Sequence, residues 1–428
     1  MENKIFNNAV WIIGARIFQA LLNMLITMLT ARYLGPSNFG SLNYAMAVVA
    51  FVTPLMHLGF TSIAVQEIIN HPKNEGEILG TSIKSSFLSA IMCTIGVIAF
   101  TLVANAGETE TIIVCLLYST VLLIGSFDVL TYWFQSKLMS KYVSLVSLFA
   151  FFITALFKAY LLITGKNIYW FSISNAIDYS IIAVLSLLLY KKLGGQKLSF
   201  SKETFFRMLD KSKYYIISEL MIVVFAQTDR IMLKLMVDES ATGLYSAAVS
   251  CAGMTSFVFA AIIDSFRPVI FESKKKDEES FKRNMCRLYS IVIYLAVIQC
   301  IGIFLLSKYI ILILYGSEYL PAIDALKIIS WYTVFSYLGA IRNIWILAEN
   351  KQRIIWKIDV SGALANVVLN ALLIPSFGIN GAAFASLVTQ FFTNVVVVAI
   401  LKEVRPNIGF MLKSLSPKWI VDIVKSIK

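Results

Sequence analysis

Long apolar runs alternate with short polar breaks along almost the whole chain of 428 residues. Each run has about 20 residues, the length a helix needs to cross roughly 30 Å of hydrocarbon. The runs are continuously apolar and do not alternate with a period of two, which predicts helices and not barrel strands. The predicted membrane spans are residues 10–30, 41–62, 83–104, 111–134, 143–164, 169–190, 214–236, 243–266, 288–306, 326–347, 358–375 and 381–401.

The break between the first two predicted spans contains Gly35 and Pro36. Proline has no backbone donor and fixes its own φ, so this pair is expected to end the first helix. Asn38 and Ser41 follow it and suit a turn or a helix cap. We therefore predict a turn at the membrane surface, from which Arg32 can reach lipid headgroups.

Composition agrees with a membrane protein. Hydrophobic residues make up 58% of the chain and charged residues only 14%, and the mean hydropathy is +0.76. Soluble domains carry roughly 25% charged residues. The N-terminus lacks the short apolar core and cleavage site of a removable signal peptide, so the first span is expected to act as an uncleaved insertion signal. The sequence predicts an all-α polytopic membrane protein.

Lysine and arginine accumulate in every second loop, and such loops are normally cytoplasmic. With the N-terminus inside, most of the 37 basic residues fall in inner loops. Outer segments hold only Arg32, Lys166, Lys308 and Lys327. Both termini are therefore predicted to be cytoplasmic. The net charge of +12 is explained by these loops and by attraction to anionic lipids, so no nucleic-acid partner is expected.

The chain divides into two similar halves. The predicted organisation is an N-terminal lobe at 1–190, a cytoplasmic linker at 191–213, a C-terminal lobe at 214–401 and a basic cytoplasmic tail at 402–428. Each half starts inside and has six spans, so the lobes would be parallel, pseudo-symmetric repeats around a central cavity. Transporters built in this way move their substrate between the halves by alternating access.

Two sequence echoes support the repeat. The turn after the first span matches the turn after the seventh, aligning Gly40 with Gly243. YWFQSKLMSKY before the fifth span matches NIWILAENKQR before the eleventh, aligning Trp133 with Trp345. Each echo is short, but both members of each pair occur at the same position within their half.

Ionisable side chains inside predicted spans are candidate functional groups, because burying them costs several kcal/mol unless they face a partner or a cavity. The candidate cavity cations are Arg16, Arg230, Arg342 and Lys158. Arg16 and Arg342 lie close enough to the inner surface to snorkel instead. For Arg230 the structural alternative is a buried pair with a neighbouring carboxylate.

Three further residues are candidates for ion coupling or for pairing: Asp178, Asp128 and His57. Asp178 and Lys158 differ in depth by about 4.5 Å, so an ion pair between adjacent helices is an alternative to substrate contact. Asp128 lies toward the inner end of its span, where a cap or surface pair is common. His57 can titrate near neutral pH, although a hydrogen-bonded packing role also suits a single membrane histidine.

The sequence contains no motif for catalysis or cofactor binding. The five cysteines follow no metal or disulfide spacing and are expected to pack as small apolar side chains. No nucleotide-binding loop, zinc motif or nucleophile triad occurs. We therefore predict no enzymatic activity, no cofactor and no metal site.

Several segments resemble one known family. ARYLGPSNFGSLNYA (31–45), QEI (66–68), TDRIML (228–233), GLYSAA (243–248) and the segment from Ala365 to Gln390 resemble, in order, the landmarks of bacterial polysaccharide exporters. These are the Wzx-like O-antigen or capsule-repeat flippases of the multidrug/oligosaccharidyl-lipid/polysaccharide exporter superfamily. Gln66, where relatives commonly carry arginine, and His57, where an acidic residue is frequent, depart from the pattern.

The resemblance implies a flippase that moves undecaprenyl-diphosphate-linked oligosaccharide from the cytoplasmic to the outer leaflet of the bacterial inner membrane. Arginines suit the diphosphate of this substrate. A glycan polymerase and a chain-length protein are the implied partners of a monomeric transporter in lipopolysaccharide or capsule biosynthesis. The alternatives are a multidrug exporter of the same superfamily and a membrane glycan polymerase or ligase. The short outer loops disfavour the latter.

Overall fold

The computed structural model describes residues 2–419 and 422, with side chains described from residue 19 onward except at residue 62. The described residues form helices and turns, and no strand occurs among them. The chain forms two compact units, unit 1 at residues 1–235 and unit 2 at residues 236–428. The prediction of an all-α membrane protein is confirmed.

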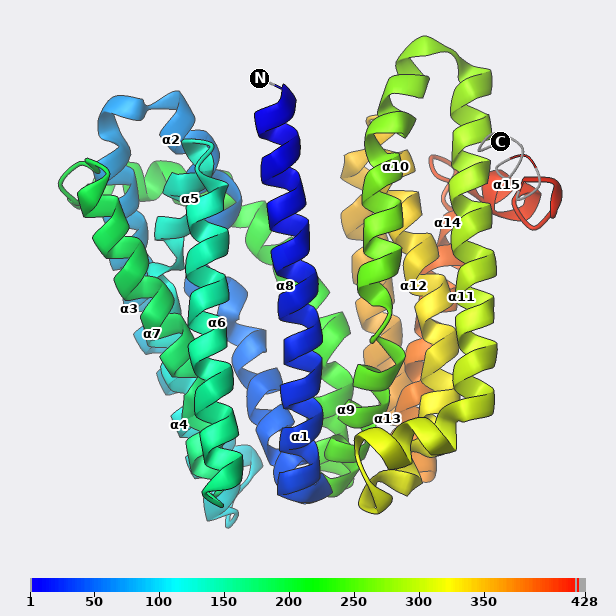
Figure 1. The fold of residues 1–428 in the computed structure, drawn as a ribbon, viewed down its shortest axis with the longest axis horizontal. Coiled ribbons are helices and arrows are strands. Elements are labelled where there is room, and N and C mark those ends of the chain that lie inside the picture. The colour runs from blue at the N-terminus through cyan, green and yellow to red at the C-terminus, as the bar shows by residue number, and fades with distance from the viewer. Residues whose placement is uncertain (1, 420–421, 423–428) are drawn as a thin grey trace. The chain divides into compact units, whose positions relative to one another are not determined.

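Unit 1 begins with α1 (Glu2–His57), a helical hairpin made of two arms. At Gly35 the backbone leaves helical geometry, with φ 72° and ψ 171°. Figure 1 shows α1 running from the N-terminus to a turn, after which the chain runs back. Positive φ suits glycine, and Pro36 can begin the second arm because a first-turn residue needs no backbone donor. The predicted Gly-Pro break is thus confirmed.

The second arm of α1 ends earlier than the predicted span limit at residue 62. Leu58 and Gly59 both take left-handed φ values, 53° and 63°, and α2 (Phe60–Asn70) starts directly after them. A Cβ atom on Gly59 would lie 2.9 Å from the carbonyl oxygen of Ser212. Only glycine fits this close approach without strain, so the break is set by packing against α8, which hydropathy does not report.

The remaining helices of unit 1 are α3 (Glu75–Ala104), α4 (Thr109–Gly125), α5 (Val129–Ser136), α6 (Ser140–Ile163), α7 (Ile168–Lys192) and α8 (Lys202–Met236). Short 3-10 turns, η1 (Pro72–Asn74) and η2 (Ser126–Asp128), precede α3 and α5. Helix α4 packs against α3 and α7, and α6 packs against α7 and α1. Helices α4 and α5 together occupy the fourth predicted span.

The segment at 196–201, between α7 and α8, forms an extended strap along α3. Ser199 N donates to Gly76 O at 3.2 Å, and Ser201 N donates to Thr81 Oγ1 at 3.0 Å. A Cβ atom on Gly80 would lie 2.3 Å from Ser199 O. The segment predicted as a linker therefore packs directly on unit 1, and Met208 of α8 is fully buried.

Unit 2 contains α9 (Glu239–Ala252), α10 (Ser256–Lys276), α11 (Glu278–Leu314), α12 (Ile323–Ala348), α13 (Ile355–Phe391), the π-helix η5 (Phe392–Val396), α14 (Val397–Ile400) and α15 (Pro406–Lys413). Two 3-10 turns, η3 (Ser317–Ala322) and η4 (Gln352–Ile354), precede α12 and α13. Helices α9 and α10 are bent by 45° at the break between them. Helix α13 leaves helical geometry at Gly378, with φ 53° and ψ −130°, three residues after Pro375.

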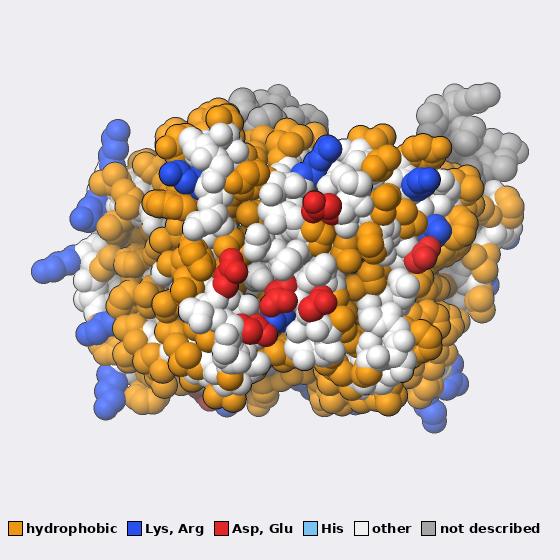
Figure 2. All heavy atoms as spheres, turned by 90° about the horizontal axis from the view of Figure 1, so that it is seen from below, with side chains coloured by type: hydrophobic (Ala, Val, Ile, Leu, Met, Phe, Trp, Pro, Cys, Tyr) orange, Lys and Arg blue, Asp and Glu red, His pale blue; other side chains and the backbone are white. Residues whose placement is uncertain are grey.

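Seven described helical stretches are long and apolar enough to cross a membrane, and the bent pair α9 and α10 makes an eighth. Two of the seven, Gln19–His57 and Gln352–Ile400, have 39 and 49 residues and are broken at Gly35 and Gly378. Each is long enough for two crossings of about 20 residues. Figure 2 shows hydrophobic side chains over much of the face drawn. The count of twelve crossings stays a prediction.

The tryptophan echo has a structural counterpart in the two units. Trp133 and Trp345 are each 2% exposed. Five residues beyond each, Leu138 and Asn350 take left-handed φ values of 57° and 56°. The turn hydrogen bonds also match, since residue 139 donates to the carbonyl of 134 at 2.7 Å and residue 351 donates to that of 346 at 2.9 Å. The same helix-ending turn therefore occurs at equivalent positions.

Candidate functional site

Lys158 of α6 lies at the centre of a polar cluster in unit 1. Its Nζ donates to Asn175 Oδ1 of α7 at 2.9 Å, and Asn175 Nδ2 donates to the Tyr118 hydroxyl of α4 at 3.0 Å. Thr154 Oγ1 donates to Asp178 Oδ1 at 3.5 Å. Asn175 and Asp178 are three residues apart and share one face of α7. Three helices thus bring their polar groups together within an otherwise apolar bundle.

Lys158 and Asp178 do not form the direct ion pair considered from their depths. The described residues contain no contact within 4.0 Å between their charged groups, and the two attract each other at longer range. Asn175 takes the direct hydrogen bond in place of the carboxylate. Lys158 is half-buried, so its ammonium group keeps donors that no described residue uses.

Asp128 and His57 are two further titratable residues of unit 1. Asp128 closes η2 and is close enough to Asp178 for mutual repulsion. His57 ends the second arm of α1, and its buried Nδ1 has no hydrogen-bond partner among the described residues. Two carboxylates therefore accompany one lysine in this region. No group of three metal-binding side chains occurs in the described part of the chain.

Arg342 of α12 is the buried cation of unit 2, with a residue exposure of only 3%. Its Nη1 donates to Asn394 Oδ1 at 2.7 Å, and its Nη2 donates to Asn343 Oδ1 at 2.9 Å. Asp359 of α13 attracts it at longer range. The guanidinium therefore does not extend to the surface of unit 2, and amide oxygens accept its direct hydrogen bonds.

The partner Asn394 belongs to the π-helix η5, which is a rare element found often at functional sites. Two glycines make room for it. A Cβ atom on Gly339 would lie 2.4 Å from Asn394 Oδ1, and one on Gly362 would lie 2.6 Å from Thr393 Oγ1. The side chains of η5 thus fill the space that these glycines leave on α12 and α13, and this fixes Asn394 against Arg342.

The other two predicted cavity cations are placed differently. Arg230 of α8 belongs to unit 1 and donates through Nη1 to Gln227 Oε1 at 2.7 Å. Arg16 lies on α1, and its side chain is outside the described residues. Arg230 and Arg342 thus belong to different units, and the convergence of Arg16, Arg230 and Arg342 on a single cavity stays a prediction.

Unit 1 contains a second polar network, which was not predicted from the sequence. Lys234 of α8, whose side chain is 3% exposed, pairs with Glu108 at 2.7 Å. Asn105 Nδ2 donates to Glu108 Oε2 at 3.2 Å, and the Tyr44 hydroxyl donates to Asn105 Oδ1 at 2.8 Å. The hydrogen bond from Lys234 lowers the pKa of Glu108 below its ordinary value. The depth of Lys234 was visible in the sequence, but its partner lies 126 residues away.

Glu67, inside the QEI motif, is a further buried acid of unit 1 and is 2% exposed. Lys211 Nζ lies 2.5 Å and Arg207 Nε lies 3.5 Å from its carboxylate. These contacts join α2 to the first turns of α8. The QEI motif was the only sequence feature that indicated a role for Glu67, and its basic partners could not be identified from sequence alone.

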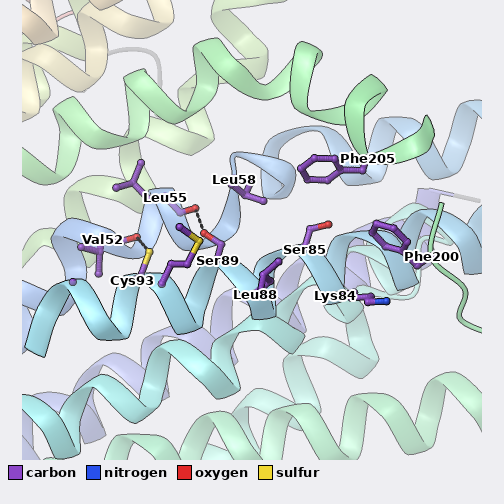
Figure 3. Close-up of a pocket in the computed structure, with 12 residues that line it drawn as sticks. Val52, Leu55, Leu58, Lys84, Ser85, Leu88, Ser89, Cys93, Phe200 and Phe205 are labelled. Atoms are coloured by element: carbon purple, nitrogen blue, oxygen red, sulfur yellow. Dashed lines mark hydrogen bonds between the residues drawn. The ribbon is translucent and has the colours of Figure 1, made fainter. Parts of the chain in front are cut away.

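An apolar groove of about 660 Å³ runs along unit 1 between α3, the second arm of α1 and the strap (Figure 3). Lys84 lies at one end, with its Nζ 4.8 Å from the centre of the Phe200 ring. Gly96 lies twelve residues further along α3, so the groove follows about 18 Å of helix. Such a surface can accommodate a hydrocarbon chain with a polar group near Lys84.

Comparisons with known proteins agree on one family. The sequence profile of the family described as "Polysaccharide biosynthesis protein" matches residues 5–274. The chain is 24% identical over 217 residues to the probable low-salt glycan biosynthesis flippase Agl15 of Haloferax volcanii, which covers 50% of this chain and 46% of that protein. It is 23% identical over 407 residues to the probable flippase AglR of the same organism, covering 91% and 82%. The match spans about half the length of Agl15 and of a further curated relative.

A solved structure also shares the fold. The lipid II flippase MurJ, in an inward closed conformation, matches 97% of this chain and 93% of its own chain with a TM-score of 0.74. The sequence identity is only 14%, so this likeness concerns the arrangement of the helices. It shows that this chain shares that arrangement of helices over nearly its whole length.

Proposed function

This chain belongs to the polysaccharide biosynthesis protein family, and we propose that it flips a lipid-linked oligosaccharide across the membrane. The resemblance noted in the sequence is confirmed by the family match. The observation that carries the proposal is the likeness to the probable flippase AglR over 91% of the chain. The substrate class would be a polyprenyl diphosphate bearing a short glycan, such as an O-antigen or capsule repeat.

The described cations support an anionic substrate. Lys158 in unit 1 and Arg342 in unit 2 give their direct hydrogen bonds to asparagine oxygens. Neutral partners leave the charge of each cation in place, although the aspartates near Lys158 offset part of its charge. A diphosphate has about two negative charges, which Lys158 can help to stabilise during the passage.

The groove along α3 supports the lipid part of the substrate. Most of its lining side chains are apolar, and Lys84 provides a cation at one end. A polyprenyl chain could remain in the hydrocarbon while only the headgroup crosses. With a negative cell interior, outward movement of negative charge is favourable by about 2.3 kcal/mol per charge per 100 mV.

The topology and the energy source are part of the same proposal. Alternating positive loops favour cytoplasmic termini in the bacterial inner membrane. The excess of carboxylates around Lys158 favours coupling to a proton or a cation, with Asp128, Asp178 and His57 as the groups involved. Agl15 and AglR are named for flipping and not for a chemical reaction, which favours a transporter over a glycan polymerase or ligase.

Deletion of the gene in its native host tests the function. The expected result is loss of surface glycan and accumulation of lipid-linked oligosaccharide on the cytoplasmic side. A plasmid copy should restore export, Lys158→Met should restore it poorly, and the exposed-site control Lys308→Met should restore it fully. Unchanged surface glycan and no precursor accumulation after deletion would rule out this function.

A further inference from the structure

Unit 2 contains a second cavity, of about 600 Å³, at the end where α10 meets α11. Its walls come from this helix turn, from the end of α12 and from the segment at 406–419 that includes α15. The last wall is fixed to the unit, because the Tyr289 hydroxyl of α11 donates to Asn407 Oδ1 at 2.8 Å and both residues are fully buried. The Tyr294 hydroxyl also donates to the Leu415 carbonyl at 2.8 Å. The cavity is therefore a built part of the fold.

Five lysines and two glutamates line this cavity, and the glutamates are already paired. Lys274 Nζ lies 2.5 Å from Glu349 Oε1 and 3.0 Å from Glu278 Oε2. Lys282 Nζ lies 3.7 Å from Glu278 Oε1. These contacts use both carboxylates and leave the other three lysines without a negative partner in the cavity.

Those three lysines are Lys351, Lys413 and Lys418, and no described carboxylate lies within 4.0 Å of their ammonium groups. Lys351 Nζ lies 4.9 Å from the centre of the Trp345 ring, and Lys418 Nζ lies 5.1 Å from that of Trp419. The lining set thus carries a formal excess of three positive charges. Clustered ammonium groups over aromatic rings suit phosphate oxygens, which accept charge-assisted hydrogen bonds.

The side chains beside the cavity are of the kinds found at a membrane surface. Leu412 and Leu415, which flank Lys413 in sequence, are 63% and 55% exposed, and Lys351 Nζ donates to the backbone carbonyl of Glu403 at 2.9 Å. A short segment that combines exposed leucines with lysines is typical of the membrane interface, and tryptophan is a common residue at that level. The exposed leucines are expected to enter the acyl region while the lysines stay at headgroup depth.

We propose that this cavity binds the phosphate-bearing headgroup of a membrane lipid through Lys351, Lys413 and Lys418. Basic pockets between membrane helices recognise anionic lipids in this way. The phosphate could belong to an anionic phospholipid or to a polyprenyl diphosphate, since both present the same group at the same depth. The proposal goes beyond the flipping function and does not depend on it.

The test measures lipid binding to the purified full-length chain in detergent by native mass spectrometry and by thermal shift. The probes are phosphatidylglycerol, undecaprenyl diphosphate, zwitterionic phosphatidylcholine and inorganic diphosphate. Phosphatidylglycerol or undecaprenyl diphosphate should bind more tightly than phosphatidylcholine, and whichever binds more tightly identifies the source. Inorganic diphosphate that binds as tightly as either anionic lipid would overturn the assignment to a lipid.

Substitutions of the three lysines test whether the anionic lipid binds in this cavity. Lys351→Gln, Lys413→Gln and Lys418→Gln combined should weaken anionic-lipid binding about tenfold or more. The triple arginine variant at these positions should retain it, because arginine also binds phosphate. A control that removes the same charge from exposed positions outside the cavity is Lys275→Gln, Lys276→Gln and Lys402→Gln combined.

The control should bind lipid like the parent chain. Equal weakening in the control and in the cavity variant would show diffuse attraction and overturn the proposal. Should the triple glutamine variant fail to fold, Lys413→Gln and Lys418→Gln are measured singly, and each should weaken binding about two- to threefold or more. Unchanged binding in both single variants would also overturn it.

Discussion

Each of the two units contains a cation inside apolar helices, and the groups that surround this cation differ between the units. In unit 1 the half-buried Lys158 donates to Asn175 and has two aspartates, Asp128 and Asp178, in its surroundings. In unit 2 the buried Arg342 donates to Asn394 and has one aspartate at longer range. Each cation bonds directly to an amide, but only the cluster of unit 1 has excess negative charge.

This difference predicts that Arg342 contributes mainly to stability and Lys158 mainly to transport. Arg342 is committed to holding the π-helix against α12, so its loss should act mainly on folding. Lys158 keeps unused donors and lies among groups that can exchange protons or cations, so its loss should act mainly on transport. Variants of Arg342 should therefore change mainly the free energy of unfolding, and variants of Lys158 should change mainly the transport rate.

The largest effect is expected from Arg342→Met. The change removes a buried cation and leaves the amide oxygens of Asn394 and Asn343 without their donor, which should lower the free energy of unfolding by about 3 kcal/mol. Denaturant unfolding of the purified chain in detergent measures it. Lys308→Met, at an exposed position, is the control and should leave stability unchanged. Equal stability of both variants would contradict a structural role for Arg342.

Gly339→Ala should act on the same contact without touching a charge. The new Cβ would lie 2.4 Å from Asn394 Oδ1, so the π-helix must shift, at a cost of about 2 kcal/mol. Gly302→Ala in α11 is a matched control, because no atom lies within 4 Å of its added Cβ. That control should gain up to about 1 kcal/mol from better helix propensity. Thermal unfolding of both variants in parallel gives the comparison, and a Gly339→Ala variant as stable as the control would contradict the close packing.

Lys158→Met should lower stability by only about 1 to 2 kcal/mol, because one direct hydrogen bond is lost. The loss should be partly reversed by adding Asp178→Asn, since the remaining repulsion between Asp128 and Asp178 then disappears. A double-mutant cycle on the free energy of unfolding measures this coupling. Strictly additive effects would show that the two residues do not interact.

A smaller effect is expected at the pair of Glu108 and Lys234, which serves as a reference outside both clusters. The lowered pKa of Glu108 contributes stability that is present above the ordinary pKa of a glutamate and is lost as pH falls through the lower folded value. Because the Glu108 side chain is 43% exposed, the contribution should stay below about 1 kcal/mol. Unfolding midpoints at several acidic pH values measure it, and Glu108→Gln should flatten the curve. An equally steep curve in that variant would assign the pH dependence to other groups.

Much of the helical architecture could be predicted from hydropathy and from the Gly-Pro break at Gly35. The matched turns after Trp133 and Trp345 were also visible as a sequence echo. The strap at 196–201 and the break at Leu58 and Gly59 were not, because close backbone packing leaves no hydropathy signal.

The candidate site was predictable only in part. Charged residues within apolar runs identified Lys158 and Arg342, since burial of charge is costly. Their partners Asn175 and Asn394 are neutral and lie 17 and 52 residues away, so neither spacing nor charge indicated them. The π-helix that carries Asn394 depends on contacts with Gly339 and Gly362 and has no sequence pattern of its own.

Reconstitution tests the flipping function most directly. The purified chain is placed in liposomes that contain a polyprenyl-diphosphate-linked oligosaccharide on the inner leaflet, and a membrane-impermeant lectin or glycosidase reports its arrival outside. The account predicts protein-dependent arrival that is slowed strongly by Lys158→Met and left unchanged by Lys308→Met. Arrival at the rate of protein-free liposomes, with folded chain present in the membrane, would contradict it.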